Sequence, residues 1–403
     1  MSYIGKTPTS VPLTSSDITD GIITSAKIAD GSIATADIAD AAVTKVKTSG
    51  VSSNPFRNII INGDMSIAQR ATSEASVGNS FTYFTVDRFK LGGAGSSSAR
   101  FTMSQDTDVP TGQGFATSLK MDVTTADASL GSSDALRISQ FIEGQNLQYL
   151  KKGTANAEST TLSFWVKSNK TGTYISELRD IDNARSISKS YTIDVADTWE
   201  KKTITFAGDT SGAFDNDNNT SLRLSNWLYA GTDYTSGTLQ TSWGTLTATD
   251  RAVGQVNFAD STANNFWITG VQLEAGTTAS DFEFLPVDVN LQRCLRYYQM
   301  FINDINQLLN FGIAYLSSDV RIFGELLTVM RTTPSLEVAS GTDYYRFIRN
   351  ATSDYCDDFS LNDKTTTRIY GIINSSDMSG TAGIAGYIQS NSASSYIAFD
   401  GEL

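Results

Sequence analysis

The first fifty residues repeat with a period of ten, and this repeat limits what the chain can fold into. From Val11 the phrases VPLTSSDIT, DGIITSAKIA, DGSIATADIA and DAAVTKVK align. Apolar residues recur every five positions, at Leu13, Ile18, Ile23, Ile28, Ile33, Ile38 and Val43. Five residues of α-helix turn about 500°, which leaves successive apolar side chains about 140° apart. The repeat therefore predicts no amphipathic helix.

Two structures remain open for this repeat. One is a disordered, low-complexity arm. The other is a fibrous shaft, in which three chains point their apolar rows at a shared axis. Disorder requires no period, so the regular spacing favours the shaft. We expect residues 1–50 to form an anchor and shaft, with the seven apolar residues near the axis of a homotrimer.

The rest of the chain is predicted to be mainly β. After a hinge at residues 51–56, short alternating runs are separated by polar turns. They lie at 58–62, 81–86, 118–123, 161–167, 192–195, 202–206 and 265–273. Such runs, with few helical patterns between them, predict a jelly-roll-like antiparallel β-sandwich over residues 57–287.

The last part of the chain is predicted to be a helix followed by a small β domain. Leu291, Leu295, Tyr298 and Ile302 are spaced as on one helix face, so we expect a connecting helix at 288–304. This helix could dock on its own domain or form a three-helix junction on the fibre axis. Strand-like runs at 345–349, 368–373 and 396–399 predict a β domain at 305–403.

Composition excludes several functions. The chain has no histidine, which excludes a Ser-His-Asp triad, a Cys-His dyad and a zinc site with histidine ligands. We expect no nucleic-acid partner, because a chain with a net charge of −13 repels the phosphate backbone. We expect no signal peptide and no membrane insertion, because no apolar stretch is long enough. Cys294 and Cys356 could form a disulfide, but two buried thiols in a cytoplasmically folded protein are the preferred interpretation.

A series of motifs resembles phage tail fibre proteins. RNIIINGDM at 57–65 resembles the opening strand of carbohydrate-binding-module-like domains in such fibres. Further matches follow in order: SIAQR, VDRF, ISQFIEG, TLSFWVKS, ITGVQLEAG, RCLRYYQ and the terminal FDGEL. The N-terminal YIGKTP and LTSSDITDGII resemble the start of fibres from cyanophage-type marine phages, and MRTTPS at 330–335 resembles a turn of fibre C-terminal domains. The chain departs from the pattern at Ala68 and Phe89, where the family has tryptophan, and at 279–283.

The resemblance implies a structural virion protein that is made in the host cytoplasm. It would be a homotrimeric tail fibre, joined to the phage tail or another virion protein through its N-terminus. Its task would be to attach the phage to host envelope polysaccharide or lipopolysaccharide. A tailspike-like glycanase and a head or neck fibre without a receptor role are the alternatives. No carboxylate pair stands out among the acids, so we expect no enzyme.

Four aromatic residues are the candidate sugar contacts. They lie between residues 225 and 243 in a segment rich in Gly, Ser and Thr: Trp227, Tyr229, Tyr234 and Trp243. Flat aromatic faces suit the apolar side of a sugar ring. The alternative is that they pack in a small core under a long loop. Trp165 and Trp267 lie in alternating runs and are predicted to be core residues.

The resemblance also suggests a structural calcium ion, and we expect no other cofactor. Asp64 and Glu274 are oxygen donors at matching family positions. Calcium takes six to eight oxygen ligands, so these two carboxylates would need further partners.

Overall fold

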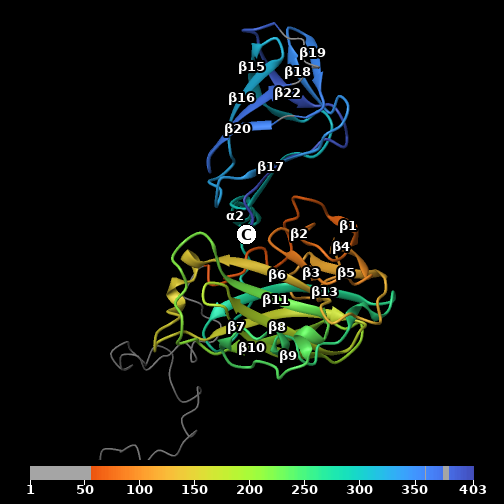
Figure 1. The fold of residues 1–403 in the computed structure, drawn as a ribbon, viewed down its shortest axis with the longest axis vertical. Helices are drawn as coiled ribbons and strands as arrows, with labels where there is room; N and C mark the ends of the chain where they lie inside the picture. Colours follow the sequence, from red (N-terminus) through yellow and green to blue (C-terminus); the bar gives the residue numbers. More distant parts are fainter. Residues whose placement is uncertain (1–55, 359, 375–380) are drawn as a thin grey trace, which may run out of the picture. The chain divides into compact units, whose positions relative to one another are not determined.

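The computed structural model describes residues 56–358, 360–374 and 381–403, and this part of the chain is mainly β (Figure 1). Its strands form four antiparallel sheets, and two α-helices accompany them in the described residues. The predicted shaft at 1–50, with its axis residues, lies outside the described residues. The shaft and the homotrimer therefore stay predictions.

Two sheets form the predicted sandwich. Sheet A has the strand order β1-β4-β5-β13-β7-β10, and sheet B has the order β12-β9-β8-β11-β6-β3-β2. The strands of sheet A are β1 Ser73–Val77, β4 Arg100–Asp106, β5 Ser118–Thr125, β7 Thr160–Ser168, β10 Glu200–Phe206 and β13 Asn265–Ala275. The strands of sheet B are β2 Phe81–Tyr83, β3 Lys90–Ala94, β6 Ala135–Glu143, β8 Gly172–Asp180, β9 Arg185–Ile193, β11 Thr220–Ala230 and β12 Gly244–Thr245.

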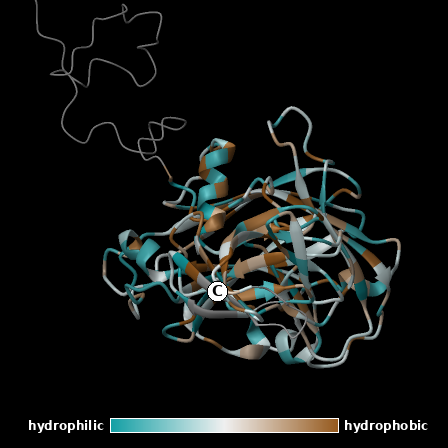
Figure 2. Cartoon of the chain, turned by 90° about the horizontal axis from the view of Figure 1, so that it is seen from above, coloured by the Kyte–Doolittle hydropathy of each residue, from teal (hydrophilic) through white to brown (hydrophobic). Residues whose placement is uncertain are grey.

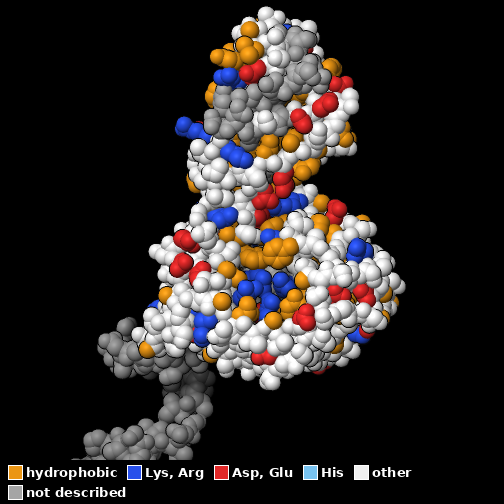
Figure 3. Space-filling view, in the orientation of Figure 1, with side chains coloured by type: hydrophobic (Ala, Val, Ile, Leu, Met, Phe, Trp, Pro, Cys, Tyr) orange, Lys and Arg blue, Asp and Glu red, His pale blue; other side chains and the backbone are white. Residues whose placement is uncertain are grey.

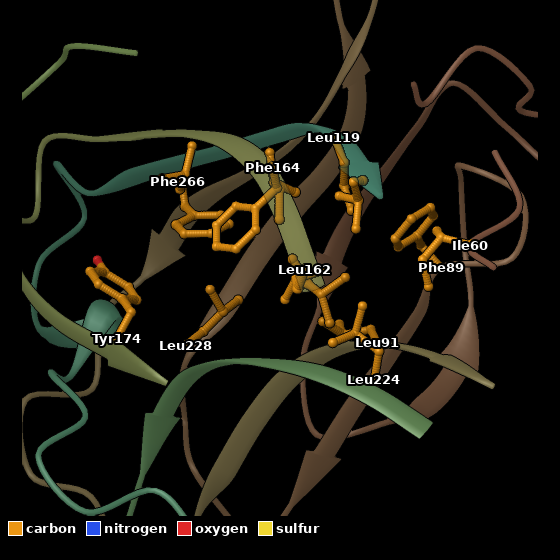
Figure 4. Packing of buried hydrophobic residues seen from close by; sticks show 14 of the residues in the cluster. Ile60, Phe89, Leu91, Leu119, Leu162, Phe164, Tyr174, Leu224, Leu228 and Phe266 are labelled. Atoms are coloured by element: carbon orange, nitrogen blue, oxygen red, sulfur yellow. The ribbon is translucent and has the colours of Figure 1, made fainter. Parts of the chain in front are cut away.

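The core fills the space between the two sheets. Figure 4 shows Leu162, Phe164 and Phe266 of sheet A close to Leu224 and Leu228 of sheet B. Figure 2 shows hydrophobic stretches along the strands, whereas the connecting loops are largely hydrophilic. Successive side chains of a strand point to opposite faces. The residues between these core positions therefore lie on the outer faces of the sheets.

Most strands predicted for the sandwich are confirmed, but the run at 58–62 forms no strand. Its first link is strand-like, because the Ile59 N–H donates to the Leu273 carbonyl at 2.9 Å. The next two backbone N–H groups donate to side chains instead. Ile60 bonds Asn58 Oδ1 at 3.0 Å, and Ile61 bonds Gln140 Oε1 at 2.8 Å. The side-chain amides thus take the place of a neighbouring strand.

The helix predicted at 288–304 is shorter than expected. Helix α2 spans Val287–Leu295, and strand β14 follows at Tyr298–Ile302. The prediction was wrong for this second half, because Tyr298–Ile302 pairs with β23, Ile397–Asp400. Helix α2 docks on its own domain, since Cys294 is buried in a cluster with Ile61 and Ile67.

The C-terminal region holds two further sheets. Sheet C has the order β14-β23-β17, and sheet D has the order β19-β18-β22-β15-β16-β21-β20. Their remaining strands are β15 Leu308–Leu316, β16 Asp319–Glu325, β17 Ser335–Val338, β18 Tyr345–Arg349, β19 Thr352–Cys356, β20 Ser360–Lys364, β21 Arg368–Asn374 and β22 Ala385–Ser390. The three runs predicted as strands are confirmed as β18, β21 and β23. Cys356 is buried in the cluster of this region, apart from Cys294, so both cysteines are buried as expected.

The last residues of the chain pack against the sandwich within the compact unit Asn54–Leu403. The Arg88 guanidinium is buried, forms an ion pair with Glu402 and donates to the Phe141 carbonyl at 2.6 Å. Arg70 Nη2 lies 3.0 Å from Asp400 Oδ2. The VDRF and FDGEL motifs therefore meet in one buried charge network.

No helix in the described residues is long and apolar enough to span a membrane.

Candidate functional site on the outer face of sheet B

Two neighbouring strands of sheet B carry the same outward pattern. Each has arginine, serine and an aromatic residue at alternate positions: Arg137, Ser139 and Phe141 on β6, and Arg223, Ser225 and Trp227 on β11. The intervening Leu136, Ile138, Leu222 and Leu224 belong to the core. The alternation of a β-strand therefore places both sets of three on the outer face.

The antiparallel register makes the two patterns complementary. Arg137 lies opposite Trp227, and Arg223 lies opposite Phe141. The two serines face each other, with their hydroxyl oxygens 2.9 Å apart. A row of small serine side chains is thus flanked on each side by a row that contains one arginine and one aromatic residue.

Strand β8 and a loop extend this face. Glu177 and Arg179 of β8 lie opposite Ser225 and Arg223 of β11. Arg251, from the loop after Ala248–Asp250, binds Glu177 in a bidentate manner, with Nε–Oε1 and Nη2–Oε2 distances of 2.7 and 2.8 Å. We call the following set the arginine face: Arg137, Arg179, Arg223 and Arg251, with Glu177.

The arginine face holds an excess of buried positive charge. Burial alone would raise the pKa of Glu177, but Arg251 and Arg223 outweigh it and hold the pKa at about 2. Burial lowers the pKa of Arg137, and repulsion by Arg251 lowers it further. The pKa of Arg223 is lowered by burial and then by Arg137. One carboxylate therefore faces four guanidinium groups, all of which remain protonated at neutral pH.

Several donors of the arginine face have no hydrogen-bond partner in the described structure. They are Arg137 Nε, Arg179 Nε, Arg223 Nε and Nη2, and the indole Nε1 of Trp227. The Arg223 Nη2 atom lies 3.7 Å from Glu177, within reach of its charge but beyond a hydrogen bond. Buried polar groups in native proteins are nearly always hydrogen-bonded. Ordered water or a polar ligand can supply the acceptors that these donors lack.

Aromatic rings adjoin the cations. The guanidinium carbons of Arg137 and Arg251 lie 5.2 and 5.0 Å from the ring centre of Trp227. Phe81 of β2 contacts Phe141 edge to face at 5.8 Å and is 48 % exposed. Figure 3 shows Lys and Arg side chains gathered beside hydrophobic ones on the face where Figure 1 labels β6, β11 and β8. A cavity of about 350 Å³ shares Phe141 with this face, but its other lining residues, among them Tyr149, Arg293 and Arg296, lie outside the arginine face.

The four aromatic residues predicted from the sequence divide into two groups. Residues 225–230 lie in strand β11 rather than in a loop, and Tyr234 lies in helix α1, Thr232–Thr235. The rings of Trp227 and Tyr234 are 5.4 Å apart, and both lie near Arg251.

The other two residues lie away from the arginine face. Tyr229 is buried in the sandwich core and stacks on Phe101 at 6.3 Å. Trp243 packs against the same core cluster and donates its indole N–H to the Ala207 carbonyl at 2.8 Å. Nothing in the structure tests a sugar contact for any of the four, so that role stays a prediction.

Arg137, Glu177, Arg223 and Arg251 were not expected from the sequence. The signal for Arg137 and Arg223 is the Arg-x-Ser-x-aromatic pattern, which appears once in LRISQF and again in LRLSNW; Glu177 and Arg251 lie outside this pattern. In a strand, this spacing places all three side chains on one face.

The two carboxylates proposed for calcium are held by protein donors. Asp64 Oδ1 accepts from Ser66 Oγ and Asn290 Nδ2, each at 3.1 Å. Glu274 accepts from the backbone and hydroxyl of Ser280 at 2.8 and 2.7 Å. Within the described ranges, no group of three or more Asp, Glu, Cys or His side chains could hold a metal ion.

Comparisons with known proteins find likenesses among solved structures alone. No protein-family profile matches the chain, and no curated protein matches it. The enzymatically active domain of bacteriophage CBA120 tailspike protein 4 is 15 % identical, with a TM-score of 0.30 over 55 % of this chain and 22 % of that one. The family 11 carbohydrate-binding module of cellulase Lic26A-Cel5E from Clostridium thermocellum is 12 % identical, with a TM-score of 0.25 over 51 % and 98 %.

A third similar structure is TmCBM61 in complex with β-1,4-galactotriose. It is 10 % identical, with a TM-score of 0.27 over 54 % of this chain and 99 % of that one. The structural neighbours thus include a phage tailspike domain and carbohydrate-binding modules. TM-scores below 0.5 do not decide a ligand or an activity, so the function has to be judged from the arginine face itself.

Proposed function

We propose that this chain is a non-catalytic glycan-binding protein and that the outer face of sheet B is its binding surface. The observation that carries the proposal is the pair of complementary Arg-x-Ser-x-aromatic rows on β6 and β11. Saccharide sites combine flat aromatic surfaces with a few fixed polar groups. Both kinds of group occur here, on rigid strands rather than on mobile loops.

The larger side chains of this face would make the contacts with a sugar. Ser139 and Ser225 are buried between them, so a ligand would meet the arginine and aromatic side chains on either side of the serine row. Gly92 of β3 continues the face, since a Cβ at this position would lie 3.2 Å from Phe81 and 3.3 Å from Arg137. A saccharide chain laid across the strands would meet arginine donors over β6 and β11 and the exposed ring of Phe81 over β2.

Hydrolysis is disfavoured by the acid inventory of this face. Glycosidases use two carboxylic groups, one of which must carry a proton. Glu177 is the acid of the arginine face, and its two oxygens are held by Arg251. Its pKa of about 2 keeps it ionised at neutral pH, so it cannot serve as a general acid.

We further propose that the chain is a homotrimeric tail fibre of a virion, which attaches the phage to host envelope glycans. The ten-residue repeat and the fibre-like motifs support this role. In this proposal the N-terminus joins the tail or another particle protein. Three copies of a weak site would act together, and avidity can strengthen binding by about two to four orders of magnitude.

Sheet D offers a surface that supports self-association. Phe311, Ile313 and Tyr315 alternate along β15 and are all exposed. Phe311 is 69 % exposed and Phe323, on the neighbouring β16, is 62 % exposed. Figure 3 shows hydrophobic side chains over the region where Figure 1 labels β15. Contiguous apolar patches of this kind mark interaction surfaces, and further copies of the chain are the proposed occupants.

A binding assay with purified host envelope polysaccharide tests the glycan proposal. The full chain should bind and release no new reducing ends, and Phe81→Ala should weaken binding without lowering the melting temperature. Phe284→Ala is a matched control, because Phe284 is 50 % exposed and packs on Phe115 and Phe282 instead. New reducing ends would support a glycanase instead. An equal loss of polysaccharide binding in both variants would show that the glycan does not bind on sheet B.

A further inference from the structure

The charge of the arginine face is opposite to that of the whole chain. The protein carries a net charge of −13. On this face four arginines surround the single carboxylate of Glu177, which is fully buried. A neutral sugar needs hydrogen-bond donors and acceptors but no such excess of one sign. The excess of positive charge on the arginine face therefore favours a glycan that carries negative charge.

A purely structural role leaves part of this cluster unexplained. Arg251 uses Nε and Nη2 on Glu177, so this pair is complete in itself. Arg223 is 3 % exposed and Arg137 is 8 % exposed, yet their Nε atoms have no partner in the described structure. The single charge of Glu177 is bound by Arg251 and lies 3.7 Å from Arg223 Nη2, so it compensates the buried cations only in part, and cation–π contacts with Phe141 and Trp227 offset only part of the remaining cost. An anionic ligand would complete the site.

We propose that the arginine face binds an acidic saccharide through the carboxylate of a uronic-acid-type sugar; this inference rests on the proposed glycan-binding function. Arg223 and Arg137 flank the serine row from opposite sides and are the groups that pair with the carboxylate. A guanidinium matches a planar carboxylate with two parallel hydrogen bonds, which a point charge such as lysine cannot reproduce. Glu177 stays bound to Arg251 and repels anions placed over β8, so the carboxylate belongs over β6 and β11.

A carboxylate-binding site at Arg223 and Arg137 would distinguish acidic sugars from neutral ones. A carboxylate on the sugar meets two arginines whose donors lack partners. The corresponding neutral sugar leaves those donors without an anionic acceptor after water has been displaced, and unpaired buried groups are the strongest source of discrimination between ligands. Acidic polysaccharides should therefore be preferred to neutral polysaccharides with the same backbone.

Carboxyl reduction provides the matched ligands for the test. The full chain is titrated with polygalacturonate, alginate and hyaluronan, each in its native and its carboxyl-reduced form, and with dextran and dextran sulfate. We expect the best-bound uronan to lose at least about tenfold in affinity on reduction, as for a lost charge-assisted hydrogen bond. Arg223→Gln and Arg137→Gln should each cause a similar loss, and Arg223→Lys should not restore binding. Lys201→Gln, at an exposed position on β10, removes the same charge elsewhere and should have no effect.

The melting temperature of each variant shows whether weaker binding reflects a lost contact or an unfolded protein. Two arginine positions are substituted because one of the two variants could fail to fold. Equal affinity for native and carboxyl-reduced forms would overturn the inference, as would tighter binding of dextran sulfate than of every uronan. Binding of neutral glycans that is sensitive to Phe81→Ala would leave the proposed function standing and reject the acidic ligand. Absence of binding to every polysaccharide, including that of the host envelope, would reject both.

Discussion

The buried ion pair between Arg88 and Glu402 offers the sharpest prediction about stability. Arg88 is 1 % exposed, and the Glu402 side chain is 4 % exposed. The Glu402→Gln variant keeps the shape but leaves the guanidinium without its counter-charge. Removal of one partner of a buried pair costs about 3–5 kcal/mol, because the remaining charge stays desolvated. Arg70, whose Nη1 lies 3.5 Å from Glu402 Oε1, loses part of its compensation as well.

Urea unfolding and thermal melting measure this cost. We expect Glu402→Gln to lower the free energy of unfolding by about 3–5 kcal/mol and the melting temperature by about 4–7 °C. The control is Glu158→Gln, which breaks a pair with Lys151 whose side chains are 41 % and 54 % exposed. Exposed pairs contribute at most about 1 kcal/mol. A loss below about 1 kcal/mol for Glu402→Gln would show that the C-terminal residues do not stabilise the sandwich through this pair.

Three further predictions concern other parts of the fold. A Cβ at Gly63 would lie 2.0 Å from the Val271 carbonyl oxygen, so Gly63→Ala should lower the melting temperature; an unchanged melting curve would contradict this packing. Burial raises the pKa of Asp87 to about 6, despite hydrogen bonds that lower it. The protonated form is therefore favoured in the folded state, and the contribution of Asp87 to stability should fall by roughly 3 kcal/mol as pH rises from about 4 to about 6. Asp87→Asn should flatten this slope in urea titrations, and a slope that persists would assign it to another group. Light scattering should give three times 43.5 kDa for the full chain, and Phe311→Lys combined with Phe323→Lys should reduce this mass; a retained trimer would exclude the sheet D surface.

Strand periodicity predicted much of the fold. The alternating run at 161–167 became β7, Thr160–Ser168, and the run at 345–349 became β18 with the same bounds. The alternation of apolar and polar residues is a local property, so it indicates a strand regardless of which strand is the partner. Failures occurred where side chains or distant strands decided the structure. Asn58 and Gln140 bond the backbone at 58–62, and pairing with β23 draws Tyr298–Ile302 out of the predicted helix.

The arginine face could not be assembled from the sequence in the same way. Arg137 and Arg223 lie on strands that neighbour each other only through the sheet order β11-β6, and Arg251 arrives from a loop. Local spacing can place arginine, serine and an aromatic residue on one strand face, but register alone brings the arginine of one strand opposite the ring of the other. Trp227 was identified for its aromatic surface, whereas the charges around it depend on long-range pairing.

A structure of the full chain with a bound oligosaccharide from the host envelope would locate the glycan on the protein. We expect sugar density on the outer face of sheet B, across β6 and β11, with a carboxylate within hydrogen-bond distance of Arg223 or Arg137. Density elsewhere would contradict it. One such place is the hollow of about 330 Å³ lined by Tyr83, Tyr298 and Tyr396.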